Sequence, residues 1–144
     1  MYLRQKSTIN STLAVFDTLD SQKAIEKAFF ETQCVHIKGF VGSGFSFRIA
    51  AAFQKQQHNL LLVVDNAEQA AYYLNDFERL LNPEDVLYFP ASYRQPYAQE
   101  TTDNANVLLR SEVFKKISVN KKPLIVVTYP QAVFEKIISQ HTLK

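Results

Sequence analysis

Residues 39–46 read Gly-Phe-Val-Gly-Ser-Gly-Phe-Ser, and this stretch decides the fold that the sequence predicts. It contains all three glycines of the 144-residue chain. A short apolar run at 34–38 precedes it, and a helical pattern at about 43–57 follows it. Glycines between a strand and a helix at this spacing are typical of the phosphate loop, G-x-x-x-x-G-K-[ST]. The backbone N–H groups of such a loop, with the helix dipole, favour a bound anion.

One fixed position of the phosphate-loop pattern is not met. The lysine position holds Phe45, although the hydroxyl position keeps Ser46. The lysine of a working loop reaches the outer phosphates and the hydroxyl holds magnesium, whereas phenylalanine supplies neither a charge nor a donor. We therefore expect a degenerate loop without ATPase activity. The ring of Phe45 can fill the anion-binding nest formed by the backbone N–H groups of the loop. This degenerate phosphate loop comprises Gly39, Gly42, Ser43, Gly44, Phe45 and Ser46.

Two nearby residues have a functional and a structural interpretation. Arg48 is a candidate substitute for the missing lysine, but its place in the first helical turn favours a solvent-facing side chain. Asp65 follows a predicted strand and resembles a magnesium-holding acid. The run from 65 to 68, Asp-Asn-Ala-Glu, instead favours helix capping, with Glu68 or Gln69 placed for a capping box. We take the structural interpretation of both residues.

The rest of the chain alternates short apolar runs with helical patterns. This order predicts an α/β fold: a parallel sheet with right-handed crossovers and helices on both faces. Residues 1–20 form an N-terminal extension with little signal, and 21–144 form one domain, expected to be part of a longer polypeptide. The predicted strands are 34–38, 60–64, 86–89 and 124–128, and the predicted helices are 21–31, 43–57, about 66–81, 104–118 and 130–138.

Composition excludes several classes of protein. The chain is 47% hydrophobic and 21% charged with a net charge of +2, so it has no large basic field for nonspecific nucleic-acid binding. No apolar run reaches the roughly 20 residues that span a bilayer, and residues 1–10 lack the apolar stretch typical of a secretory signal. The single cysteine, Cys34, rules out an internal disulfide. We expect a cytoplasmic protein with no membrane partner.

An aromatic loop follows the third predicted strand. Tyr88, Tyr93, Arg94 and Tyr97 would lie at the carboxyl end of that strand, where α/β sheets bind ligands. They form either a surface for bases or a partner protein, or a loop held to the domain by its aromatics. In the second case Arg94 would bond to Glu100 or Asp103. We favour the second interpretation.

Basic residues gather at the end of the helix predicted at 104–118. Lys115 and Lys116 are a candidate phosphate-contacting surface, together with Lys121 and Lys122. Cations at this position more often complement the helix dipole and face water. The histidines, at 36, 58 and 141, have no spacing that indicates a metal site.

Several segments together resemble the N-terminal domain of bacterial transcription-repair coupling factors, especially those of Bacteroidetes-like type. The similarity covers about residues 20–144 and is strongest in the second half. It rests on the loop at 39–46, AYYLND at 71–76, YFPASYRQPY at 88–97, DNANVLLR at 103–110 and VVTYP at 126–130.

The resemblance implies a P-loop NTPase (RecA-like) fold that has lost nucleotide binding, in line with Phe45. Family members are multidomain proteins that displace stalled RNA polymerase with an ATP-driven motor and recruit the excision nuclease. Their N-terminal module resembles the B subunit of that nuclease and binds its A subunit, mainly through a segment that would follow Lys144. ATP, magnesium, RNA polymerase and DNA would engage domains absent from this chain, so no cofactor and no catalytic residue is expected here.

Three functions remain open from the sequence: a non-catalytic protein-binding module, an unusual NTPase that uses Arg48, and a small DNA-binding module. Phe45 argues against the NTPase. The even charge balance argues against the DNA-binding module, as does a loop at 90–103 too short for the DNA-gripping hairpin of the B subunit. A Phe45→Lys change is expected to gain about 1–3 kcal/mol of nucleotide binding if the nest is intact.

Overall fold

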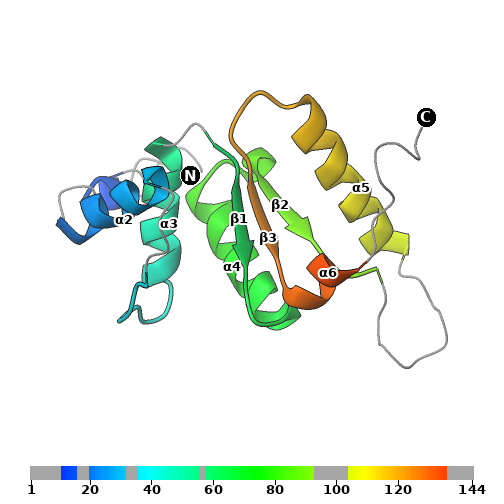
Figure 1. Cartoon of the computed structure of the whole chain (residues 1–144), viewed down its shortest axis with the longest axis horizontal. Helices are drawn as coiled ribbons and strands as arrows, with labels where there is room; N and C mark the ends of the chain where they lie inside the picture. Colours follow the sequence, from blue (N-terminus) through cyan, green and yellow to red (C-terminus); the bar gives the residue numbers. More distant parts are fainter. Residues whose placement is uncertain (1–10, 16–19, 32–35, 56–57, 93–103, 136–144) are drawn as a thin grey trace, which may run out of the picture.

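The chain forms an α/β structure around a small parallel sheet (Figure 1). The computed structural model describes residues 11–15, 20–31, 36–55, 58–92 and 104–135. Within these residues the sheet has three strands in the order β1-β3-β2. They are β1 (Leu60–Val63), β2 (Val86–Phe89) and β3 (Ile125–Thr128). The central strand is buried along its whole length, as its continuous β-branched sequence IVVT predicts.

Five labelled helices accompany the sheet. In Figure 1, α4 lies behind β1 and β3, α5 runs along the β2 side, and α2 and α3 stand beside β1. Helix α4 contacts β2 and β3, while α3 packs on α4 and α2 packs on α3. A 3-10 turn, η1 (Pro83–Asp85), leads into β2. The helices are α2 (Asp20–Phe30), α3 (Gly44–Lys55), α4 (Ala67–Leu80), α5 (Asn104–Val119) and α6 (Pro130–Phe134).

Local sequence signals set the element boundaries. Asn66 caps α4, because its side-chain oxygen accepts a 2.9 Å hydrogen bond from the Gln69 amide. Gln69 in turn donates to Asp65 Oδ2 at 3.1 Å. The predicted capping role of the segment that begins at Asp65 is therefore confirmed. Pro130 occupies the first turn of α6, where its missing N–H costs nothing.

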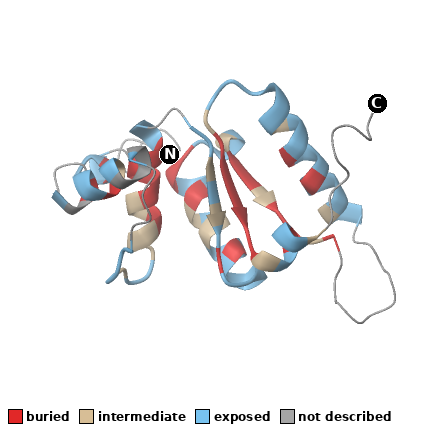
Figure 2. Cartoon of the chain, in the orientation of Figure 1, coloured by how far each residue is buried: buried red, intermediate tan, exposed pale blue. Residues whose placement is uncertain are grey.

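One face of the sheet is only partly covered. The register aligns Leu61 with Val126 and Leu87, and aligns Val63 with Thr128 and Phe89. Aligned residues of paired strands point to the same face. Helix α5 covers the β2 side of this face, but Leu61 and Val63 remain 59% and 49% exposed. Figure 2 shows the buried residues gathered on the strands and on the helix surfaces that face them.

The predicted strand at 34–38 is wrong in its described part. His36, Ile37 and Lys38 are irregular and exposed, and they pair with no strand of the sheet. The predicted run alternates apolar residues with His36 and Lys38, so it lacks the uninterrupted apolar surface of β1 and β3. Residues 34 and 35 lie outside the described part of the chain, as does the end of the helix predicted at 130–138. The other predicted strands and helices form within a few residues of their expected bounds.

No helix in the described ranges combines the length and apolarity that crossing a membrane requires.

Candidate functional site

The degenerate phosphate loop turns sharply into α3. Gly39 and Gly42 have φ angles of +90° and +55°, which L side chains rarely adopt. No heavy atom lies within 4 Å of the position that a Cβ would take at either residue. Glycine is therefore required there by the backbone conformation and not by a crowded neighbour. The Gly44 amide donates to the Val41 carbonyl at 3.2 Å and closes the turn.

Phe45 packs sideways against α4. Its ring lies between Phe40 and Tyr73, with centroid distances of 5.6 and 5.4 Å and edge-on geometry in both pairs. Tyr73 continues this aromatic row to the fully buried Phe77. The ring that replaces the phosphate-loop lysine therefore joins the loop to the core through α4.

Both hydroxyls of the loop also bind α4. The Ser43 hydroxyl lies 2.7 Å from that of Tyr72, and the Ser46 hydroxyl donates to Asp76 Oδ2 at 2.6 Å. Ser46 is fully buried. Two hydrogen bonds and one ring pair thus join the loop to α4. We call them the α3–α4 contact: Ser43 with Tyr72, Phe45 with Tyr73, and Ser46 with Asp76. In it, the hydroxyl that would hold magnesium already has a carboxylate acceptor.

Burial beside these groups raises the pKa of Tyr73. Loss of hydration is the main cause, and the neighbouring Tyr72, Asp76 and Asp65 add to it because each disfavours a second negative charge. The sequence by itself does not indicate that the loop and residues 71–76 touch. Tyr72, Tyr73 and Asp76 span one helical turn. Their spacing places them on one side of the helix, and this is the sequence feature that could have indicated a contact surface.

A cavity of about 530 Å³ lies on the other side of the loop, between α2 and the N-terminal end of α3. We call it the basic cavity, because His36, Lys38 and Arg48 line it together with Gly39 and Gly44. Arg48 is partly buried and lines this cavity. The backbone carbonyl of Arg48 accepts a 3.1 Å hydrogen bond from Gln22 of α2. Gln22 Oε1 is buried without a hydrogen-bond partner in the described structure.

A second polar cluster lies at the carboxyl ends of β2 and β3. The buried Arg110 of α5 donates to the carbonyls of Pro90 and Ala132, at 2.7 and 3.1 Å. Its guanidinium carbon lies 4.1 Å from the centroid of the Phe89 ring, and a nitrogen lies 3.5 Å from Glu135 Oε2. Because these donors face acceptors already in the fold, the cluster serves to hold the chain where it leaves β2.

The same cluster fixes the first residues of the aromatic loop. Glu135 accepts hydrogen bonds from both the amide and the hydroxyl of Ser92. The Ala91 amide donates to the Tyr129 hydroxyl at 2.9 Å, and Asn106 donates to the Ala91 carbonyl at 2.9 Å. Sequence reasoning missed these residues. Arg110 lies three residues before the buried Val113, and a polar residue on a buried helical face was the available signal.

Tyr88 belongs to β2 and lies next to Tyr129, with ring centroids 6.5 Å apart. Burial, then the neighbouring Tyr129, raises the pKa of Tyr88 far above its ordinary value. Tyr88 thus packs against Tyr129 near the end of β2. Tyr93, Arg94 and Tyr97 lie outside the described residues, and so does the predicted Arg94 pairing with Glu100 or Asp103.

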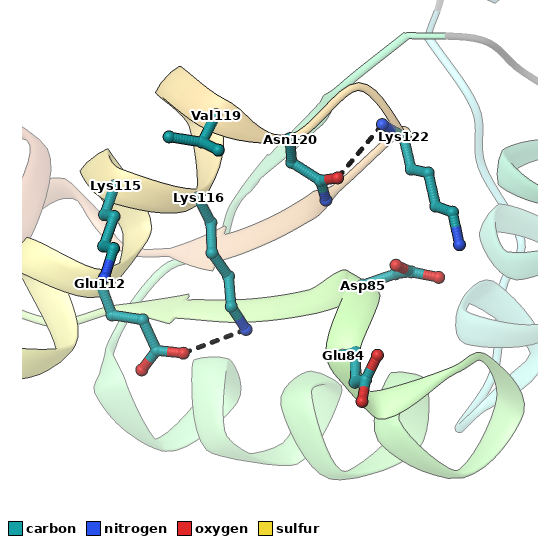
Figure 3. A pocket seen from close by; sticks show the side chains of 8 residues that line it. All are labelled: Glu84, Asp85, Glu112, Lys115, Lys116, Val119, Asn120 and Lys122. Atoms are coloured by element: carbon teal, nitrogen blue, oxygen red, sulfur yellow. Dashed lines mark hydrogen bonds and ion pairs between the residues drawn. The ribbon is translucent and has the colours of Figure 1, made fainter.

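The lysine cluster borders a hollow of about 610 Å³ between η1 and the end of α5 (Figure 3). Lys115, Lys116 and Lys122 line it together with three carboxylates. Lys116 forms a 3.0 Å ion pair with Glu112 within α5. Figure 3 shows Glu84 and Asp85 across the hollow, below Lys122. The charges balance, so this surface has no excess of positive charge to attract phosphate.

The described histidines, His36 and His58, are both exposed. In the described part of the chain, no three His, Cys, Asp or Glu side chains gather into a possible metal site. Cys34 and His141 fall outside that part.

No protein-family model matches the chain, and no curated protein or solved structure matches it either.

Proposed function

We propose that this chain is a non-catalytic, protein-binding module of P-loop (RecA-like) ancestry, the N-terminal part of a transcription-repair coupling factor. In this proposal it works in the cytoplasm in transcription-coupled nucleotide excision repair and helps to recruit the A subunit of the excision nuclease. The full-length protein would displace stalled RNA polymerase with motor domains that lie outside this chain.

The α3–α4 contact is the observation that supports the proposal. A magnesium–nucleotide site needs the phosphate-loop lysine and a hydroxyl available to the metal. Here Phe45 takes the lysine position and packs on Tyr73, and the Ser46 hydroxyl donates to Asp76. The carboxylate of Asp76 would also repel phosphate oxygens at this point. The loop residues thus stabilise the packing of two helices, as expected of a nucleotide fold retained as a scaffold.

An unusual NTPase remains the second candidate, and one observation favours it. Arg48 lines the basic cavity together with Gly39 and Gly44 of the loop. A guanidinium at this place has the charge that Phe45 lacks. The DNA-binding candidate gains no such support, because carboxylates line the same hollow as Lys115 and Lys116.

Two measurements test the proposal. The first is calorimetry of the chain with millimolar ATP and magnesium, where no heat of binding is expected and one-to-one binding would favour the NTPase. The second is a pull-down of the purified A subunit by the immobilised chain and, where the reading frame continues beyond Lys144, by its longer product. Retention of the A subunit is expected with the longer product, and failure of both to retain it would refute the recruiting role.

A further inference from the structure

We propose that the basic cavity docks an acidic peptide segment of a partner protein, with carboxylates bound by Lys38, Arg48 and the loop. This inference deepens the proposed function and rests on it, since both describe a protein-binding module. It adds the site and the chemistry of the bound segment.

The charge of the lining selects the ligand. Lys38 and Arg48 supply two cations and His36 supplies a ring donor, and among the described residues no aspartate or glutamate lines the cavity. The hollow beside α5 is different, because it has three lysines and three carboxylates. A one-signed lining in a concave site attracts ligands of the opposite charge and repels those of its own. The basic cavity therefore favours an acidic ligand, and the hollow favours none.

The backbone of the loop supports the same choice. The cavity wall includes Gly39 and Gly44, at the N-terminal end of the 12-residue helix α3. The N-terminal end of a helix favours an anion through the helix dipole, and arginine and lysine add charge-assisted hydrogen bonds. A carboxylate needs no magnesium, so it does not depend on the Ser46 hydroxyl, which Asp76 already holds.

The apolar part of the lining indicates a peptide. Ile25, Ile37 and Phe40 contribute to the wall, and Ile37 is 38% exposed. Residues 36–41 form an irregular segment outside any helix or strand. An acidic segment that carries one bulky apolar side chain would bury that side chain against these residues. Such a ligand uses both the cations and the apolar wall.

Selective labelling of glycine with ¹⁵N gives a direct test on the full chain. Because all three glycines lie at positions 39, 42 and 44, the labelled spectrum reports the loop alone. The probe is a peptide with two glutamates on each side of a phenylalanine. The controls are the same peptide with lysines for the glutamates and one with serine for the phenylalanine. We expect saturable shifts of the Gly39 and Gly44 signals with the probe and weaker or no shifts with the controls.

Charge reversal at Lys38 then tests the site. Fluorescence anisotropy of the labelled probe should show binding weakened about tenfold in Lys38→Glu and changed less than about twofold in Lys122→Glu. The second variant has the same change in net charge on the hollow beside α5. Circular dichroism checks that both variants fold. Ile37→Ser is a further variant, which removes an apolar side chain from the wall of the basic cavity.

Several results would overturn the inference: no glycine shifts with millimolar probe, equal weakening by the two charge reversals, or displacement of the probe by magnesium–ATP. The pull-down separates this inference from the proposed function. Retention of the A subunit without probe binding would leave the recruiting role and remove the peptide site. Probe binding without retention of the A subunit would leave the peptide site and remove the recruiting role.

Discussion

The Ser46 hydroxyl donates a 2.6 Å hydrogen bond to the Asp76 carboxylate, across 30 positions of sequence. It links the first turn of α3 to the middle of α4, where Ser46 is fully buried and Asp76 is partly exposed. Ser46 is also the residue whose hydroxyl would hold magnesium in a working phosphate loop. In this structure the proton of that hydroxyl is donated to a carboxylate of α4. The bond therefore serves as a packing contact between α3 and α4.

The Ser46–Asp76 bond is expected to stabilise the fold measurably. Ser46→Ala should lower the free energy of unfolding by about 1 kcal/mol, and Asp76→Ala by about 1–3 kcal/mol, because a buried partner is left unsatisfied. In a double-mutant cycle the two losses should not add, since both remove one bond. Urea denaturation gives the four free energies. Ser111→Ala is the control, because that exposed serine bonds only within its own helix and should cost less than about 0.5 kcal/mol. Additive losses would mean that the bond contributes nothing.

Restoring the lysine should not restore nucleotide binding by itself. Phe45→Lys removes the ring contacts with Phe40 and Tyr73 and is expected to cost about 1–3 kcal/mol of stability. Its ATP affinity should stay unmeasurable, because Asp76 still occupies Ser46 and repels phosphate. The Phe45→Lys, Asp76→Ala double variant should gain about 1–3 kcal/mol of magnesium–ATP binding. Calorimetry compares the two variants with the wild-type chain. Equal gains in both would show that Asp76 does not block the loop.

Arg110 is expected to be the most sensitive position near the carboxyl ends of the strands. Arg110→Met keeps the apolar stem and loses the bonds to Pro90 and Ala132, leaving Glu135 without its cation. Loss of one member of a buried charged cluster costs about 3–5 kcal/mol. Chemical denaturation should show this loss, and Arg110→Lys should recover only part of it, because lysine lacks the planar fork. An unchanged free energy of unfolding in Arg110→Met would mean that the cluster is not needed to hold the chain after β2.

Much of this architecture could be predicted from the sequence, and the exceptions have physical causes. The apolar runs Leu60–Val63 and Ile125–Thr128 predict parallel strands, and the Asn66 cap predicts α4. Of these two strands, β3 is buried along its length and β1 is not. The strand predicted at 34–38 does not form in its described part, residues 36–38. Alternation of apolar and polar residues does not by itself supply a neighbouring strand to accept its hydrogen bonds.

The candidate site was readable only in part. The loop glycines and the missing lysine are local features of sequence. The pairing of Ser46 with Asp76, and the meeting of Arg48 with Lys38 around one cavity, depend on how α2, α3 and α4 pack together. Side chains far apart in sequence meet through tertiary packing, which periodicity does not specify.

The raised pKa values of Tyr73 and Tyr88 predict a loss of stability at alkaline pH. Below the ordinary tyrosine pKa of 10.0 both hydroxyls are protonated in the folded and unfolded chain, and their contribution to stability is fully present. As the pH rises past this value, the unfolded chain releases these protons while the folded chain still holds them. The free energy of unfolding must then fall with increasing pH.

Urea denaturation at pH 8 and pH 10.5, with tyrosinate absorbance to follow ionisation, measures this fall. Tyr73→Phe and Tyr88→Phe each remove one shifted group, so each variant should lose less stability between the two pH values than the wild-type chain. At pH 8, Tyr73→Phe should lie within about 0.5 kcal/mol of wild type, because it keeps the ring contacts with Phe45 and Phe77. An equal alkaline loss in all three proteins would contradict the assignment. The cause of the alkaline loss would then lie in groups other than Tyr73 and Tyr88.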